Sequence, residues 1–263
     1  MSRNRKKANP EARMRLGEHL IELRKRFIVC LIAVAVAIIG GWFLADYVWE
    51  ILRAPINEIS HEDNRIAHIA FTDVTGSFGL KLKIAFVIAI FIASPIWLYQ
   101  IWAFFIPALK KREKIAAAVF LGASVPLFLS GAVVAWWALP KIVRILTSFS
   151  SKQDALLLTA GDYLNFATTL TISVGIGFVL PVFIVLLNFV DVLSAKSVIS
   201  KWRIAVLIIL VFAASVTPSV EVFSMFLIAT PMILLYAVAA ILAYFHDRRK
   251  ARQQRKTFAE YDV

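Results

Sequence analysis

Residues 27–45 read FIVCLIAVAVAIIGGWFLA, a run of 19 residues without a charged side chain. At about 1.5 Å per residue, a helix of this length crosses about 30 Å of hydrocarbon. Further runs of the same character occupy residues 84–106, 115–139, 164–190 and 222–245. The chain is therefore predicted to be an all-α, polytopic membrane protein.

The composition of the whole chain supports this class. Of its 263 residues, 60% are hydrophobic and only 17% are charged, whereas soluble domains average about 45–50% apolar and about 25% charged residues. The net charge of +12 is divided among short islands between the apolar runs. Nucleic-acid binding is therefore set aside, because it needs a basic face on a folded soluble domain. The single cysteine, Cys30, excludes an intrachain disulfide, and no removable signal peptide is expected.

A shorter run at residues 204–216 decides the topology. Its 13 residues would reach only about 20 Å as a helix, so it is either a re-entrant segment or a span where the bilayer is thinned. If all six runs cross, 22 of the 29 basic residues fall on one side, and the positive-inside rule places both termini in the cytoplasm. We therefore expect six transmembrane helices, with a short fifth helix, and a sixth that could also be short, forming a concave bundle.

The chain divides into three predicted parts. These are a basic cytoplasmic segment at 1–26, the six-helix domain at 27–245 and a basic cytoplasmic tail at 246–263. Apolar residues spaced four, three and four apart predict that the first part holds an amphipathic helix at the membrane surface. These residues are Leu16, Leu20, Leu23 and Phe27.

Prolines interrupt four of the six runs. Each proline removes a backbone hydrogen bond and tends to bend its helix. The prolines are Pro95, Pro126, Pro181 and Pro231. Bent helices are expected to shape the concave wall.

Residues able to carry chemistry are sparse. The four histidines lie outside the apolar runs without companions at metal-ligand spacing, so neither catalysis nor a metal or cofactor is expected. The runs also contain no ionisable residue, whereas transporters usually place paired charges inside their spans. A small-solute secondary transporter nevertheless remains the alternative function.

Five segments of the chain stand out by their order and spacing, namely HLIELRKRF (19–27), FTDVTGSFGLKLKIAF (71–86), SPIWLYQIWAFFIPALKKREK (94–114), GFVLPVFIVLL (177–187) and VTPSVEVFSMFLIATPMILLY (216–236). They resemble the TatC family, the multispanning component of the twin-arginine protein translocase. The similarity covers nearly the whole chain outside the two tails. The family's six-span architecture, with both termini in the cytoplasm, matches the topology derived from charge.

The resemblance implies a function, a location and partners. The protein would be a receptor for signal peptides with two consecutive arginines, in the bacterial cytoplasmic membrane. It would help to pass folded cargo proteins across the lipid bilayer together with TatA- and TatB-type single-span subunits. The oligomeric state is left open, with a homo-oligomer within the complex as one alternative.

Two carboxylates match the family's recognition patch, namely Glu22 in HLIELR and Glu113 at the end of the second-span motif. A carboxylate accepts two parallel hydrogen bonds from a guanidinium, so two carboxylates can select an Arg-Arg pair over lysines. Glu22 also stands three and four residues before Lys25 and Arg26. A surface ion pair within the helix is therefore the alternative for this residue.

Other positions match family motifs less specifically. Three are included in the expected signal-peptide site, namely Arg24, Phe104 and Pro107. Gln100 is predicted to make an interhelical hydrogen bond, and Glu221 is a candidate for partner contacts. The family's outer-loop motifs supply three candidates for structural turns, namely Pro55, Asp73 and Phe78.

The chain departs from the family in the fourth span. Many relatives carry a glutamate there that is implicated in recruiting the pore-forming partner. Val179 stands at that position in this chain, so the resemblance does not extend to that site.

Overall fold

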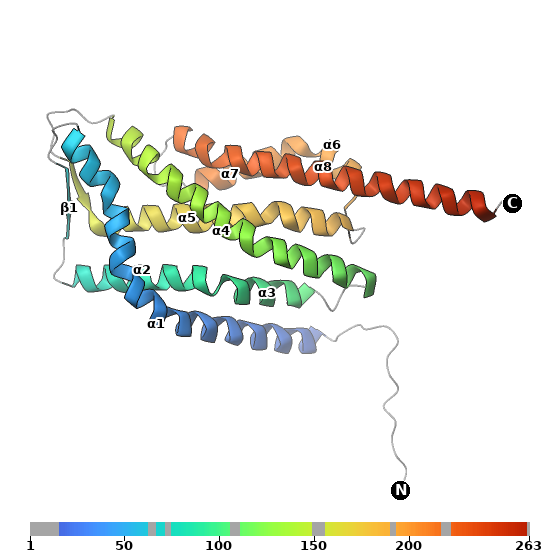
Figure 1. The fold of residues 1–263 in the computed structure, drawn as a ribbon, viewed down its shortest axis with the longest axis horizontal. Helices are drawn as coiled ribbons and strands as arrows, with labels where there is room; N and C mark the ends of the chain where they lie inside the picture. Colours follow the sequence, from blue (N-terminus) through green and yellow to red (C-terminus); the bar gives the residue numbers. More distant parts are fainter. Residues whose placement is uncertain are drawn as a thin grey trace, which may run out of the picture.

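The computed structural model describes residues 16–62, 67–71, 75–105, 111–148, 156–189, 193–216 and 222–261. The elements in chain order are α1 (Leu16–Glu62), β1 (Ala67–Ala70), α2 (Gly76–Ile92), α3 (Ser94–Phe105), α4 (Lys111–Ser148), β2 (Leu156–Thr159), α5 (Ala160–Phe189), α6 (Ala195–Ser200), α7 (Trp202–Val216) and α8 (Val222–Tyr261). The long helices run back and forth along one axis as a bundle (Figure 1). The predicted all-α class is therefore confirmed, with one small strand pair added.

The helices agree with the apolar runs. Within the described residues, α1, α4, α5 and α8 are each long and apolar enough to cross a membrane, and α2 with α3 forms a fifth such unit. Helix α7 is short, as predicted, with 15 residues, which is about 22 Å. Helix α8 has 40 residues, because its basic tail continues the helix to Tyr261. The sixth helix is therefore not short.

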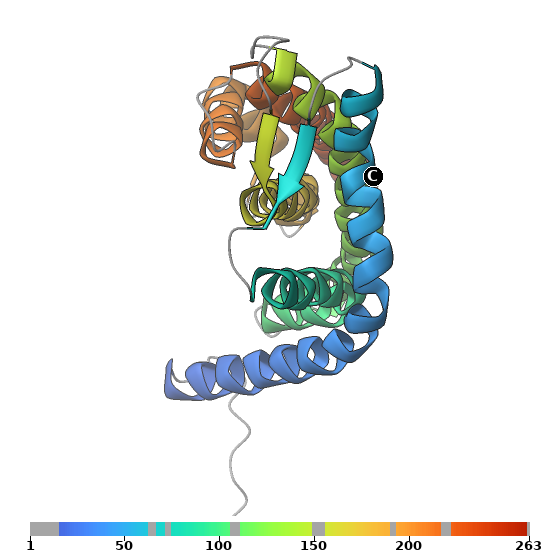
Figure 2. The same cartoon turned by 90° about the vertical axis from the view of Figure 1, so that its left-hand side faces the viewer.

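Helix α1 differs from the prediction at both ends. It is one helix of 47 residues that includes Pro55, so the N-terminal amphipathic segment continues directly into the span. Pro55 is buried inside the helix and does not form the expected turn. A proline within a helix loses one hydrogen bond but need not end the helix. Figure 2 shows α1 curving around one side of the bundle.

The bend predicted at Pro95 is present. Helices α2 and α3 meet at an angle of 55°, and the break falls at Ala93, two residues before the proline. The indole Nε1 of Trp97 donates to the Ile90 carbonyl at 2.9 Å, which satisfies a backbone acceptor beside the break. The other three prolines lie inside unbroken helices, namely Pro126 in α4, Pro181 in α5 and Pro231 in α8.

Close helix contacts depend on glycines. A Cβ atom at Gly131 of α4 would lie 2.9 Å from the Cα atom of Gly175 in α5. A Cβ atom at Gly41 of α1 would lie 2.3 Å from the Ala85 carbonyl oxygen in α2. Small residues let helix backbones approach in membranes, where association depends on packing and not on removal of apolar surface from water. These two contacts join α4 to α5 and α1 to α2.

The end of the bundle opposite the start of α1 carries a strand pair that was not predicted. β1 and β2 are parallel, with Ile69 opposite Leu158. Figure 2 shows the two strands side by side at the end that faces the viewer. Close to them, the Tyr163 hydroxyl donates to the Leu52 carbonyl at 2.7 Å. These contacts tie the end of α1 to the start of α5.

The start of the predicted tail is part of the fold. The carboxylate of Asp247 in α8 accepts from the Ala195 amide at 2.7 Å and from the Asn188 side-chain nitrogen at 3.0 Å. Asp247 thereby holds the N-terminus of α6 and the end of α5 against α8. Helix α8 therefore continues without a break past residue 246, where the basic tail is predicted to begin.

Candidate functional site

The candidate site lies at one end of the bundle, which we call the basic end. It is the end at which α1 and α4 begin and α3, α5 and α8 finish (Figure 1). Glu22 lies in the second turn of α1, and the backbone of Glu113 lies in the first turn of α4. The side chain of Glu113 lies outside the part of the molecule that the structure describes. The chain topology thus brings both predicted carboxylate positions to the same end.

Glu22 is held by a guanidinium of its own helix. Arg26 donates from Nε and Nη2 to the same carboxylate oxygen, Oε1 of Glu22, at 3.1 and 2.5 Å. The third nitrogen of Arg26, Nη1, donates to Oε1 of Gln100 at 3.1 Å. Because Gln100 belongs to α3, the predicted interhelical hydrogen bond of this residue is present. Three polar side chains therefore join α1 to α3.

The ion pair is incomplete. Within the described residues, the other oxygen of Glu22, Oε2, is buried and has no hydrogen-bond partner. The side chains of Arg26 and Glu22 are 24% and 20% exposed, so water screens part of their attraction. A pair at this helical spacing contributes only about 0.3–0.5 kcal/mol. Oε2 of Glu22 thus remains an acceptor without a donor among the described residues. The bond from Arg26 to Oε1 is weak enough to be replaced by a bond from another cation.

Helix α3 is fixed firmly beside this network. Trp102 is 3% exposed, and its indole Nε1 donates to the Ser124 hydroxyl of α4 at 3.0 Å. Ser124 in turn donates to the Phe120 carbonyl at 2.8 Å. Since Gln100 lies two residues before Trp102, the same anchor sets the position of Gln100.

The other predicted site residues fall into three groups. Arg24 is exposed on α1, and Phe104 lies one turn after Gln100 on α3. Phe78 lies at the start of α2, is 63% exposed and contacts Trp42 with ring centroids 5.8 Å apart. Three predicted residues lie outside the described part of the chain, namely Asp73, Pro107 and Glu221.

Arg26 is the residue whose place in the site the sequence did not assign. The sequence indicates only that Arg26, like Lys25, is able to pair with Glu22 along the helix. Its position four residues after Glu22, within the same HLIELRKR segment, was the available signal. The contact with Gln100 could not be predicted, because it depends on how α3 leans against α1.

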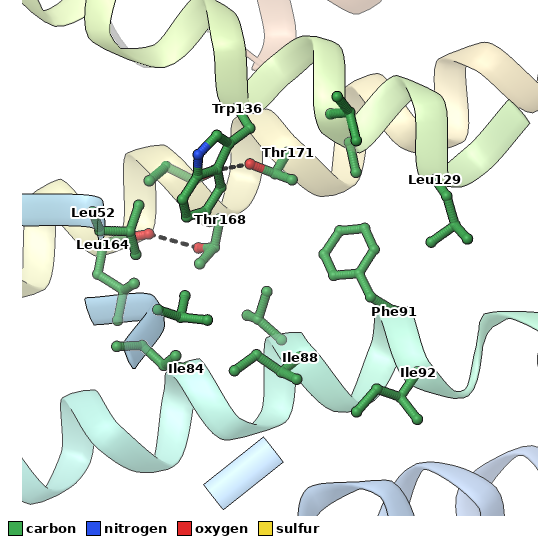
Figure 3. A pocket seen from close by; sticks show the side chains of 15 residues that line it. Leu52, Ile84, Ile88, Phe91, Ile92, Leu129, Trp136, Leu164, Thr168 and Thr171 are labelled. Atoms are coloured by element: carbon green, nitrogen blue, oxygen red, sulfur yellow. Dashed lines mark hydrogen bonds between the residues drawn. The ribbon is translucent and has the colours of Figure 1, made fainter. Parts of the chain in front are cut away.

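An apolar cavity of about 340 Å³ opens between α1, α2, α4 and α5. Figure 3 shows its wall of aliphatic and aromatic side chains, including Ile88, Phe91 and Trp136. The hydroxyls of Thr168 and Thr171 line it, but they donate to carbonyls of their own helix at 2.8 and 2.7 Å. The cavity therefore hollows one side of the bundle, and these hydroxyls are already engaged within α5.

Among the described residues, no three His, Cys, Asp or Glu side chains come together as metal ligands.

Comparison with known proteins identifies the family. Residues 18–231 match the family model of the Sec-independent protein translocase protein (TatC). Proteins named Sec-independent protein translocase protein TatC are similar over most of the chain. That of Xylanimonas cellulosilytica is 38% identical, over 92% of this chain and 87% of its own length. That of Carboxydothermus hydrogenoformans is 33% identical, over 92% of this chain and 98% of its own length.

A solved structure supports the same assignment. The crystal structure of a twin-arginine translocase receptor, TatC, superposes with a TM-score of 0.73 at 30% sequence identity, over 86% of this chain and 98% of that one. The sequence and the fold therefore agree, and this chain belongs to the TatC family of Sec-independent protein translocase proteins.

Proposed function

We propose that this protein is the receptor subunit of a twin-arginine protein translocase. It is a multi-pass protein of the bacterial cell membrane. The members of its family are Sec-independent protein translocase proteins. In this proposal, it binds signal peptides with two consecutive arginines at its basic end, on the cytoplasmic side. Single-span subunits of the TatA and TatB type then help it to pass folded cargo across the membrane.

The observation that carries the proposal is the geometry of Glu22. This carboxylate already accepts hydrogen bonds from a guanidinium through Oε1, while its buried Oε2 has no partner among the described residues. Both features suit it to receive an arginine of a ligand, because guanidinium and carboxylate form two parallel hydrogen bonds. The backbone of Glu113 lies in the first turn of α4, at the same end of the bundle, and this residue is proposed to receive the second arginine.

The surrounding positive charge restricts which ligands bind. Arg24 and Lys25 are exposed on the same helix, so a basic ligand is repelled except where a carboxylate meets it directly. Screening over about 8 Å at physiological salt weakens the repulsion at longer range. Recognition therefore depends on short, directional bonds to the two carboxylates.

The experiment measures binding of a synthetic twin-arginine signal peptide to the purified protein in nanodiscs. Glu22→Gln and Glu113→Gln keep the size of each side chain but remove its charge, and each should weaken binding at least about tenfold. Glu50→Gln is the matched control, since Glu50 lies on the same helix with a side chain 71% exposed. A peptide with two lysines should bind weakly to every variant.

Unchanged binding in both Glu22→Gln and Glu113→Gln would place the recognition site elsewhere. Binding of the single-span subunits is tested separately, by co-purification from cells with the intact protein.

The cavity in Figure 3 gives no support to the alternative of a small-solute transporter. Its lining is almost entirely apolar, and its two threonine hydroxyls are bonded to α5. The relatives reported above are all named as translocase proteins.

A further inference from the structure

The carboxylate proposed to receive the signal peptide is already occupied. The guanidinium on it belongs to Arg26 of the same helix. A guanidinium is also the group that a twin-arginine ligand would bring. Two chemically identical groups, one internal and one external, would thus compete for Glu22.

We infer that Arg26 is an internal competitor, which occupies Glu22 in the unliganded protein and is displaced when an arginine of the signal peptide binds. This inference rests on the proposed function and adds a regulatory step to the same site. It also gives Arg26 a part in setting specificity.

The geometry favours exchange over permanent pairing. Both Arg26 nitrogens bond to Oε1, and within the described residues Oε2 of Glu22 has no partner. Arg26 is tethered four residues away on the same helix and uses only one of the two oxygens. A free guanidinium is not tied to the helix, so it can form two parallel bonds with the carboxylate once the Glu22 side chain turns and brings its buried Oε2 to the ligand. The ligand can therefore make a better contact with Glu22 than Arg26 does.

Displacement does not leave Arg26 without an acceptor. Its Nη1 atom donates to Gln100 at 3.1 Å, and this nitrogen takes no part in the bonds to Glu22. That bond can persist while the other two nitrogens turn toward water, because the Arg26 side chain is 24% exposed. Gln100 thus keeps the displaced guanidinium beside the site, ready to return.

Competition of this kind discriminates between basic ligands. An arginine replaces Arg26 with an equivalent fork of donors, whereas a lysine ammonium is a point charge without that planar fork. A lysine that displaces Arg26 therefore forms fewer aligned hydrogen bonds with Glu22 than the guanidinium did. Arg26 should thus penalise lysine-containing peptides more than arginine-containing ones.

The test compares Arg26→Gln with Lys25→Gln in nanodiscs of zwitterionic phosphatidylcholine. Both changes remove one positive charge from neighbouring positions, but Lys25 is exposed and takes no part in the Glu22 contact. Binding of fluorescent Arg-Arg and Lys-Lys signal peptides is measured at physiological salt and at about 1 M salt, where the Debye length falls to about 3 Å.

Arg26→Gln should bind the Arg-Arg peptide about twofold more tightly than the unchanged protein does. The affinity ratio between the Arg-Arg and Lys-Lys peptides should also fall. Lys25→Gln should give a smaller increase that disappears at high salt, since it reports only general charge repulsion. Arg26→Lys should lie between the unchanged protein and Arg26→Gln. A thermal unfolding curve confirms that each variant is folded.

Weaker or unchanged binding in folded Arg26→Gln, relative to Lys25→Gln, would overturn the inference. It would show that Arg26 positions Glu22 and does not compete for it. That result would leave the proposed function intact, provided that the unchanged protein binds the Arg-Arg peptide and Glu22→Gln does not. Failure of the unchanged protein to bind the peptide would overturn both.

Discussion

Helices α1 and α5 are both long and apolar, yet they meet their surroundings in opposite ways. In the apolar 18-residue stretch of α5, 56% of the residues are buried inside the protein, whereas 11% are buried in the corresponding stretch of α1. Lipid is as apolar as leucine, so exposure of α1 to lipid carries no hydrophobic penalty. Helix α5 therefore supports the fold, while α1 is free to present polar groups such as Glu22 and Arg26 at its start.

The strongest test of this contrast makes the same substitution in both helices. Leu170 of α5 is 1% exposed and Leu31 of α1 is 54% exposed. Leu170→Ala should cost about 2–5 kcal/mol because it leaves a cavity. Leu31→Ala should cost less than about 0.5 kcal/mol. Unfolding in mixed detergent micelles measures both, and equal losses would mean that α1 supports the fold as much as α5 does.

A second test addresses the place where α1 is packed tightly. At Gly41 a Cβ atom would come within 2.3 Å of a backbone oxygen of α2, while at Gly40 the nearest atom, of Ile92, is 3.9 Å away. Gly41→Ala should therefore cost about 1–3 kcal/mol. Gly40→Ala should be neutral or stabilise by up to about 1 kcal/mol through helix propensity. Equal stability of the two variants would contradict the close approach.

A smaller effect is expected where α5 meets the end of α1. Tyr163→Phe removes the hydroxyl that donates to Leu52 and should reduce stability by about 1 kcal/mol. Tyr47→Phe is the control, because Tyr47 is 66% exposed on α1. The same unfolding assay should leave the control unchanged. An equally large loss of stability in Tyr47→Phe would mean that the hydrogen bond from Tyr163 to Leu52 adds nothing beyond what an exposed tyrosine hydroxyl adds.

The smallest effect is expected for the ion pair between α1 and α2. Lys81 and Asp46 lie 2.6 Å apart, but the Asp46 side chain is 75% exposed. The pair should therefore contribute only about 0.2–1 kcal/mol, less at high salt. A double-mutant cycle with Lys81→Gln and Asp46→Asn isolates this coupling energy. A larger coupling that resists salt would show that α1 is held by charge as well as by packing.

The sequence predicted the spans well because each depends on a local property. The run 27–45 lies within α1, α5 contains the run 164–190 as far as Phe189, and the short run at 204–216 lies within the short helix α7. The break at Pro95 was also predicted. Pro126, Pro181 and Pro231 do not break their helices, since neighbouring helices can compensate for a lost hydrogen bond in a membrane.

Features that depend on distant partners could not be predicted. The strands around Ile69 and Leu158 have four residues each and pair across three intervening helices. At the candidate site, the motif marked Glu22 and the spacing allowed Arg26 to bind it. The contact between Arg26 and Gln100 follows from the packing of α3 and leaves no signal in local sequence.

The strand pair has a consequence for the order in which the protein assembles. β1 leaves its backbone groups without a partner strand until α2 and α3 have crossed and α4 has returned the chain to the same end. Contacts between segments so far apart in sequence form late in folding. Protection of β1 and β2 amides from hydrogen exchange would therefore report that the chain has been inserted as far as β2.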